Sequence, residues 1–223
     1  MLIIHHLNNS RSQRILWMCE EIGIDYQIKH YQRDSKTQLA PQELFDVHPL
    51  GKSPVITDDT DGDVTVAESG AIIEYLAQNY GKELIPEHGS DEYRQYIYWL
   101  HFAEGSLMPQ MLLKLIFDKI KTSPMPFFVK PIAKGIANKV IDGYVGPNIK
   151  SNMKFIENHL NQNKWFAGDK LSGADIQMSF PLEAAMASNK SGGYPAIQTY
   201  VDKIHARDAY KKALEKGGPY DYA

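Results

Sequence analysis

One stretch of this 223-residue chain constrains its fold more than any other. Residues 48–56 read HPLGKSPVI, and residues 64–76 read VTVAESGAIIEYL. Proline cannot donate a hydrogen bond to a sheet, so Pro54 is expected at the first position of a strand or on an edge strand. A cis peptide bond before a proline costs little free energy. The alternating runs 55–56 and 64–66, joined by the turn formers of 58–63, predict a β-hairpin. A helix is expected to begin at Glu68-Ser69-Gly70.

The same stretch predicts a small-ligand site built largely from backbone. Ser53 would expose its backbone N–H and C=O, which can pair with an extended peptide as a strand does. At the expected helix start, the Ser69 hydroxyl and the free N–H groups form an anion site, and Glu68 beside them can hold an ammonium group. A ligand with a carboxylate and an amine on one carbon would fit both. The alternative is that Ser69 only caps the helix.

The composition narrows the class of protein. A hydrophobic content of 43% in 223 residues suits one compact chain of one or two domains. A net charge of −3 with scattered Lys and Arg argues against a nucleic-acid partner. No segment approaches the about 20 apolar residues that span a membrane. The first residues lack a signal-peptide pattern, so a cytoplasmic location is expected. One cysteine excludes an intramolecular disulfide, and the eight histidines form no metal-binding pattern.

The chain is expected to divide at residues 81–90, GKELIPEHGS, which are rich in turn formers. Before them, the pattern predicts a sheet with helices packed on it. The expected elements are a strand from Leu2, a helix that stops at Gly23, a strand over 26–30 and a short helix over 41–45. After them come two long helical patterns over 93–117 and 136–160, disturbed by Pro109 and by Gly146-Pro147. The proline-rich segment 122–131 between these patterns is expected to be an apolar loop or lid.

Three motifs resemble those of soluble glutathione transferases and follow one another in the same order. They are Ser10-Arg11-Ser12, the run 48–54 and the run 67–70. The resemblance covers nearly the whole chain and is closest to microbial, theta-like members with a serine near the start of the first helix. It implies an α/β plus all-α fold, with a thioredoxin-like glutathione-binding domain at residues 1–82 and a C-terminal helical-bundle domain at residues 91–223 that supplies the electrophile site. It also implies a homodimer that uses glutathione as co-substrate, without a metal or redox cofactor.

The resemblance assigns roles to residues of the two central motifs. By it, Pro54 is a cis-proline, and Ser53 offers its main chain to the cysteinyl part of glutathione. Glu68 and Ser69 hold the γ-glutamyl end. Several sites match in order at compatible spacing, which makes this chain of motifs specific.

Charged side chains outside these motifs are further candidates. Lys52 is expected at the glycyl carboxylate of glutathione, with Gln38 as a second candidate there; the alternative for Lys52 is a solvated side chain. By the resemblance, Glu104 is expected to face the γ-glutamyl amine across a dimer interface; the alternative is a solvated side chain or an intersubunit salt bridge. Arg11 can add positive potential to the pocket. Arg14 is expected to pair with an acidic group and to pin the first helix to the second domain.

Ser10 is the candidate catalytic residue, because it lies between the first strand and the first helix. A free thiol has a pKa of about 8.5, so little of it is ionised at neutral pH unless the anion is stabilised. A hydroxyl that donates a hydrogen bond to sulfur, together with the helix N-terminus, favours the thiolate. The alternative is that Ser10 or Ser12 only caps the helix, and Asn9, Ser12 and Arg11 are substitutes for the donor role.

Apolar side chains of the second half are the candidates for the electrophile site. Methionine suits irregular and varied partners, although an apolar stripe at helical spacing is more often ordinary packing. The expected wall consists of Met108, Met111, Leu112, Leu115 and Phe127, with Phe128 beside the last.

Two further residues are expected to be structural. Asp175 follows Ser172 at the spacing of a capping box and is expected to be buried and not catalytic. Cys19 lies on the inward stripe of the first helix and is expected to be an inert core thiol. No cysteine stands at the position of Ser10 or its neighbours, which disfavours the thiol-transfer chemistry of related folds.

The resemblance, together with these residues, predicts a glutathione transferase, in which the thiolate attacks an electrophilic, largely apolar small molecule as part of detoxification. Thiolate stabilisation and proximity would supply most of the rate gain. Two alternatives stay open at this point. One is reduction of hydroperoxides by the same thiolate, and the other is a non-catalytic binding or scaffold protein of the same fold.

Overall fold

A computed structural model describes residues 1–60, 62–188 and 192–223. The first half contains β1 (Leu2–Leu7), α1 (Ser12–Ile22), β2 (Gln27–Tyr31), the 3-10 turn η1 (Gln42–Leu44), β3 (Val55–Asp58), β4 (Val64–Ala67) and α2 (Ser69–Tyr80), followed by the 3-10 turn η2 (Lys82–Leu84). The second half contains α3 (Asp91–Phe102), η3 (Ala103–Leu107), α4 (Met108–Thr122), α5 (Lys130–Val140), η4 (Ile141–Val145), α6 (Gly146–Leu160), α7 (Gly173–Ser188), α8 (Pro195–His205) and α9 (Asp208–Gly217).

The sheet of the first half has the strand order β2-β1-β3-β4. β1 pairs in parallel with β2 and antiparallel with β3, and β3 pairs antiparallel with β4, so the predicted hairpin is confirmed. Successive side chains of β1 point to opposite faces. His6 is bonded to Ser12 of α1, whereas His5 is bonded to Tyr31 and Thr57 of the neighbouring strands. The expected helix stop is also confirmed, because Gly23 has φ 76° at the C-terminus of α1.

The two long helical patterns each form two helices joined by a π turn. The π turn 103–107 separates α3 from α4, and Pro109 lies in the first turn of α4. The π turn 141–145 separates α5 from α6, and Pro147 lies in the first turn of α6. A proline removes one backbone N–H and its ring crowds the preceding turn, so a wider turn just before it relieves the clash. The kinks predicted at these prolines are therefore found as π turns.

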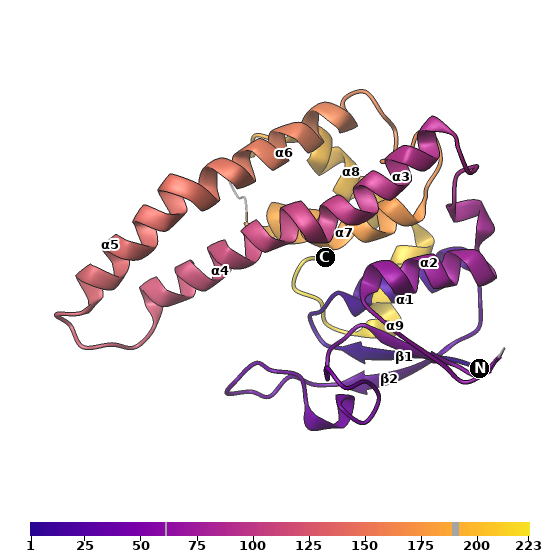
Figure 1. Ribbon diagram of the computed structural model, residues 1–223, viewed down its shortest axis with the longest axis horizontal. Helices are drawn as coiled ribbons and strands as arrows, with labels where there is room; N and C mark the ends of the chain where they lie inside the picture. The colour runs from indigo at the N-terminus through magenta and orange to yellow at the C-terminus, as the bar shows by residue number, and fades with distance from the viewer. Residues whose placement is uncertain (61, 189–191) are drawn as a thin grey trace.

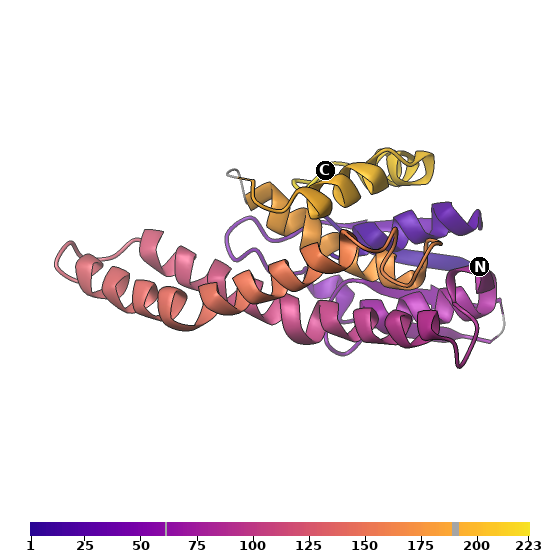
Figure 2. The same cartoon turned by 90° about the horizontal axis from the view of Figure 1, so that it is seen from above.

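α4 and α5 form an arm that extends beyond the rest of the molecule, as Figures 1 and 2 show from two directions. The loop 123–129 lies at the tip of this arm. There Phe127 and Phe128 are 87% and 64% exposed. The predicted apolar loop is therefore found within the segment 122–131, and the arm carries it away from the sheet.

Helix α1 joins the two halves of the molecule, and it packs against α2, α7 and α9. A single cluster of buried residues runs from β1 and α1 into α3, α7 and α8. Ion pairs reinforce this contact, since Glu21 and Glu20 of α1 bind Arg207 and Lys216 near and within α9. Cys19 is fully buried in the cluster, and burial raises the pKa of its thiol, as expected for an inert core cysteine. In the described residues, no helix is long and apolar enough to cross a membrane.

Asp175 has the structural role that the capping pattern predicted. Its carboxylate is fully buried and accepts hydrogen bonds of 2.9 Å from the backbone N–H and the hydroxyl of Ser172 at the start of α7. It also accepts a 2.9 Å bond from the backbone N–H of Phe166 in the preceding loop. The side chain thus fixes the loop to the helix and is buried in the core.

Candidate functional site

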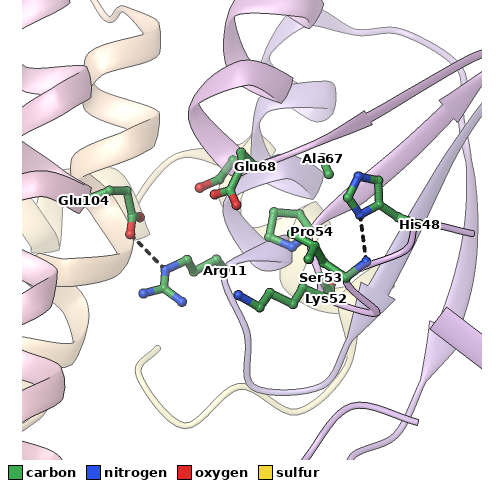
Figure 3. Close-up of a pocket in the computed structure, with 10 residues that line it drawn as sticks. Arg11, His48, Lys52, Ser53, Pro54, Ala67, Glu68 and Glu104 are labelled. Atoms are coloured by element: carbon green, nitrogen blue, oxygen red, sulfur yellow. Dashed lines mark hydrogen bonds and ion pairs between the residues drawn. The ribbon is translucent and has the colours of Figure 1, made fainter. Parts of the chain in front are cut away.

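A pocket lies between the sheet, the N-termini of α1 and α2, and the π turn after α3 (Figure 3). Its walls come from four separate places in the chain. The residues that line it are Arg11, His48, Leu50, Lys52, Ser53, Pro54, Ala67, Glu68, Ser69 and Glu104. Cationic and anionic side chains both reach it, and Figure 3 shows Arg11 and Lys52 on one side of the opening with Glu68 and Glu104 around it. Such a pocket suits a ligand that carries both signs of charge.

The floor of the pocket is the loop that leads into β3. The peptide between Ser53 and Pro54 is cis, as predicted, and Pro54 is buried. The Ser53 hydroxyl donates a 2.9 Å bond to the backbone carbonyl of His5, which ties this loop to β1. Gly51 has φ 55°, and a Cβ atom there would collide with the ring of Phe45, so the loop requires glycine. The backbone beside Pro54 is thus held in one shape.

The N-terminus of α2 forms the upper wall. Glu68 precedes the helix with φ 71°, a conformation that is rare outside glycine and that is concentrated at binding sites. Its side chain is exposed, whereas Ser69, the first residue of α2, is buried. The N–H groups of the first helical turn have no partner within the helix, and the helix dipole adds partial positive charge there. This end of α2 can therefore receive a carboxylate, with the Glu68 carboxylate beside it for an amine.

Arg14 lies behind this wall and connects three elements. Its side chain is 1% exposed, and its Nη1 donates a 2.5 Å bond to the backbone carbonyl of Gln177 in α7. Its Nη2 donates to Glu104 at 2.6 Å and to the Ser69 hydroxyl. Burial lowers the pKa of Arg14, and the neighbouring Glu104 opposes that shift. The predicted pairing of Arg14 with an acidic group is confirmed, and the bond to Ser69 adds a direct link to the pocket.

Arg11 faces the pocket beside this network. Its Nε lies 3.3 Å from Oε2 of Glu104, and about one third of each side chain is exposed. The guanidinium groups of Arg11 and Arg14 lie 5.4 and 5.8 Å from the ring centre of Phe180 in α7, so this ring supports both. Glu104 is thus held by two arginines of its own chain.

Ser10 lies next to Arg11, but the described residues that line the pocket do not include it. It is 4% exposed, and its hydroxyl oxygen accepts a 3.2 Å bond from the backbone N–H of Ser12. It also lies 2.7 Å from the Ser12 hydroxyl, which in turn lies 2.9 Å from Nδ1 of His6. Asn9 has φ 48° and exchanges two 2.9 Å bonds with Asp221 near the C-terminus. The loop between β1 and α1 is therefore firmly held.

The predicted electrophile residues lie along the arm, four of them in α4 and Phe127 in the loop after it. Met108 and Met111 are half-buried in the first turns of α4, close in sequence to Glu104. Leu112 and Leu115 are 50% and 54% exposed, and Phe127 is at the tip of the arm. The structure brings none of these five side chains into the pocket of Figure 3.

Three residues of the pocket were not predicted individually. His48 and Leu50 belong to the same motif as Ser53 and Pro54, and Ala67 directly precedes Glu68. The motifs themselves were the signal that could have found them. In the described part of the chain, no group of His, Cys, Asp and Glu side chains could hold a metal ion.

Comparison with known proteins gives a consistent result. The family model for the N-terminal domain of glutathione S-transferases matches residues 3–78, and the model for their C-terminal domain matches residues 144–208. Glutathione S-transferase 3 of Schizosaccharomyces pombe is 38% identical over 219 residues, which cover 97% of this chain and 88% of the relative. Glutathione S-transferase 1 of Saccharomyces cerevisiae is 34% identical over 220 residues, which cover 96% of this chain and 94% of the relative.

A solved structure agrees with the sequence comparisons. The crystal structure of a glutathione S-transferase from Actinobacillus pleuropneumoniae superposes with a TM-score of 0.81 at 33% identity, covering 100% of this chain and 95% of that one. The sheet with its helices is the thioredoxin-like domain of this fold, and the helices from α3 onward are its helical domain. This chain therefore belongs to the glutathione S-transferase family of enzymes.

Proposed function

We propose that the pocket binds reduced glutathione in a defined orientation. The γ-glutamyl carboxylate lies at the N-terminus of α2 near Ser69, and its amine lies near Glu68. The cysteinyl main chain pairs with Ser53 beside Pro54. The observation that carries this proposal is that one pocket combines a free helix N-terminus, an exposed carboxylate and a rigid edge of backbone.

Two cations complete the glutathione site. Lys52 is exposed at the rim and provides the positive charge for the glycyl carboxylate. Arg11, between Glu104 and the N-terminus of α1, places positive charge near the sulfur. Glu104 acts here by holding Arg11 and Arg14, and so it shapes the pocket from within its own chain.

For catalysis, we propose a serine-type, theta-like mechanism in which the Ser10 hydroxyl donates a hydrogen bond to the sulfur. Ser10 precedes α1, whose N-terminus adds partial positive charge at the same place. Both effects favour the thiolate over the thiol, and the thiolate attacks the electrophile. The proton leaves to solvent, and the sulfur forms the new bond as the leaving group of the electrophile departs.

The second substrate is an apolar electrophile in this proposal, and the reaction serves detoxification. Met108, Met111 and Leu112 are assigned to its wall, because the first turns of α4 follow Glu104 closely in the chain. Leu115 comes later in α4 and Phe127 follows the end of that helix, so these two residues are not assigned. Residues 1–82 would then bind glutathione and residues 91–223 would face the electrophile. A cytoplasmic location fits the need for reduced glutathione and the unpaired Cys19.

The exposed face of α4 supports a homodimer. None of the residues of α4, all of which the structure describes, is buried, and Leu115 and Ile116 are 54% and 44% exposed. A helix with such an apolar face is normally covered by another surface. Sedimentation equilibrium should therefore give twice the mass of the chain, and a monomer at micromolar concentration would contradict this part of the proposal.

Glu68→Gln tests the glutathione site. The variant keeps the size and the backbone position of Glu68 but removes the charge that holds the amine. A charge-assisted bond contributes about 1.5 to 3 kcal/mol, so calorimetry should show glutathione affinity reduced by about 10- to 100-fold. Glu87→Gln, at an exposed carboxylate outside the pocket, is the matched control and should bind like the wild type. Equal affinity of the two variants would show that the amine binds elsewhere.

A further inference from the structure

Behind the pocket, Ser10, Ser12 and His6 form a line of buried hydrogen-bonding groups that glutathione binding does not require. The two hydroxyl oxygens are 2.7 Å apart, and the Ser12 oxygen is 2.9 Å from Nδ1 of His6. All three side chains are less than 5% exposed. The direction of each hydrogen bond decides whether the Ser10 proton is available to a sulfur atom in the pocket.

The Ser12 hydroxyl has one proton and two lone pairs. One lone pair accepts the backbone N–H of Leu7 at 3.2 Å. The proton can go to Nδ1 of His6 at 2.9 Å, to the backbone carbonyl of Leu7 at 3.3 Å, or to Ser10. The shortest bond of the set joins the two hydroxyl groups, and only one of them can donate in it.

His6 determines which hydroxyl donates. Burial, with a smaller effect of the neighbouring His30, lowers the pKa of His6 to about 4, so the ring is neutral and carries one proton. The backbone of Gly217 opposes this lowering of the His6 pKa, and Nδ1 faces the Ser12 hydroxyl at 2.9 Å. With the proton of the neutral ring on Nε2, Nδ1 is the acceptor for the Ser12 hydroxyl. Ser12 then has no proton for Ser10, so Ser10 must donate to Ser12.

We propose that Ser12, oriented by His6, competes with the sulfur of glutathione for the proton of the Ser10 hydroxyl, and that it thereby limits how far the bound thiol ionises. This inference rests on the proposed donor role of Ser10. To bond the thiolate, Ser10 must give up the 2.7 Å bond to Ser12 and leave a buried lone pair without a donor. Ser12 and His6 are thus positioning residues that act through Ser10.

Ser12→Ala tests this competition. Alanine removes the competing oxygen but keeps the backbone N–H that donates to Ser10, and alanine is well tolerated in a helix. The Ser10 proton then goes to the sulfur without losing another bond. At saturating glutathione, the pKa of the bound thiol, read from the ultraviolet absorbance of the thiolate, should fall by about 0.5 to 1 unit relative to the wild type. An unchanged or raised pKa would overturn the proposal.

Two further variants separate this effect from a change in folding. Ser12→Thr keeps the hydroxyl and should titrate like the wild type. In the Ser10→Ala background, Ser12→Ala should leave the pKa of the bound thiol unchanged, because the hydroxyl proton for which Ser12 and the sulfur compete is absent. A fall of the same size in that background would show that Ser12 acts independently of Ser10 and would overturn the proposal.

The failure of this inference can be told apart from failure of the donor assignment. If Ser10→Ala raises the thiol pKa but Ser12→Ala does not lower it, Ser10 is the donor and the competition is absent. If Ser10→Ala has no effect, the donor assignment is wrong and this inference falls with it.

Discussion

Replacing Arg14 with methionine is expected to lower the free energy of unfolding by about 3 kcal/mol and to weaken glutathione binding. Methionine fills the apolar part of the space but cannot donate hydrogen bonds. It leaves the Gln177 carbonyl without its 2.5 Å donor and releases Glu104 and Ser69 from the guanidinium. Because these three partners belong to α7, the π turn and α2, one substitution loosens the contact between both halves of the molecule at the pocket.

Urea unfolding and glutathione calorimetry check this prediction. The matched control is Arg94→Met, because Arg94 is 65% exposed and pairs with the nearby, exposed Asp91 and the backbone of Gly89. Surface ion pairs contribute about 0 to 1 kcal/mol, so the control should unfold almost like the wild type. If both variants lose the same small amount of stability, the buried network does not hold the pocket together.

Asp175→Ala is expected to lower the free energy of unfolding by about 3 to 5 kcal/mol, the largest effect among these variants. The change removes the acceptor of three 2.9 Å bonds and leaves the buried backbone N–H groups of Phe166 and Ser172 without a partner. It also removes the cap of α7. Asp175→Asn should lose much of the same stability, since an amide offers only one acceptor oxygen to donors that approach both carboxylate oxygens.

The structural role of Asp175 predicts a second result. The protein that remains folded should bind glutathione with wild-type affinity, because Asp175 faces the core and does not line the pocket. Thermal unfolding measures the stability of the variant, and calorimetry below the unfolding transition measures its affinity for glutathione. A stable Asp175→Ala protein that has lost activity would mean that the carboxylate takes part in the reaction.

The features that could be predicted from the sequence are those coded by neighbouring residues. Pro54, the hairpin after it, and the start of α2 follow one another within 25 residues or so, and each has a local cause: a missing donor, strand alternation or a helix N-terminus. The pocket residues of this stretch were therefore found together. The same holds for Gly23 and for the capping pattern of Ser172 and Asp175.

The features that could not be predicted depend on where separate segments meet. The bond between Asn9 and Asp221 joins residues 212 positions apart, and the line from Ser10 to His6 depends on how β1 and α1 cross. No periodicity in the sequence contains this information. The apolar stripe of α4 likewise could not show that this helix is part of an exposed arm, because none of its residues is buried.

The most direct test of the account is a pH titration of the thiol of bound glutathione in the wild type and in Ser10→Ala. The account predicts that the wild-type protein lowers the thiol pKa below about 8.5, and that Ser10→Ala raises it by about one to two units and slows conjugation accordingly. Glutathione bound with an unperturbed thiol, or with a lowered pKa that is the same in both proteins, would contradict Ser10 as the group that stabilises the thiolate.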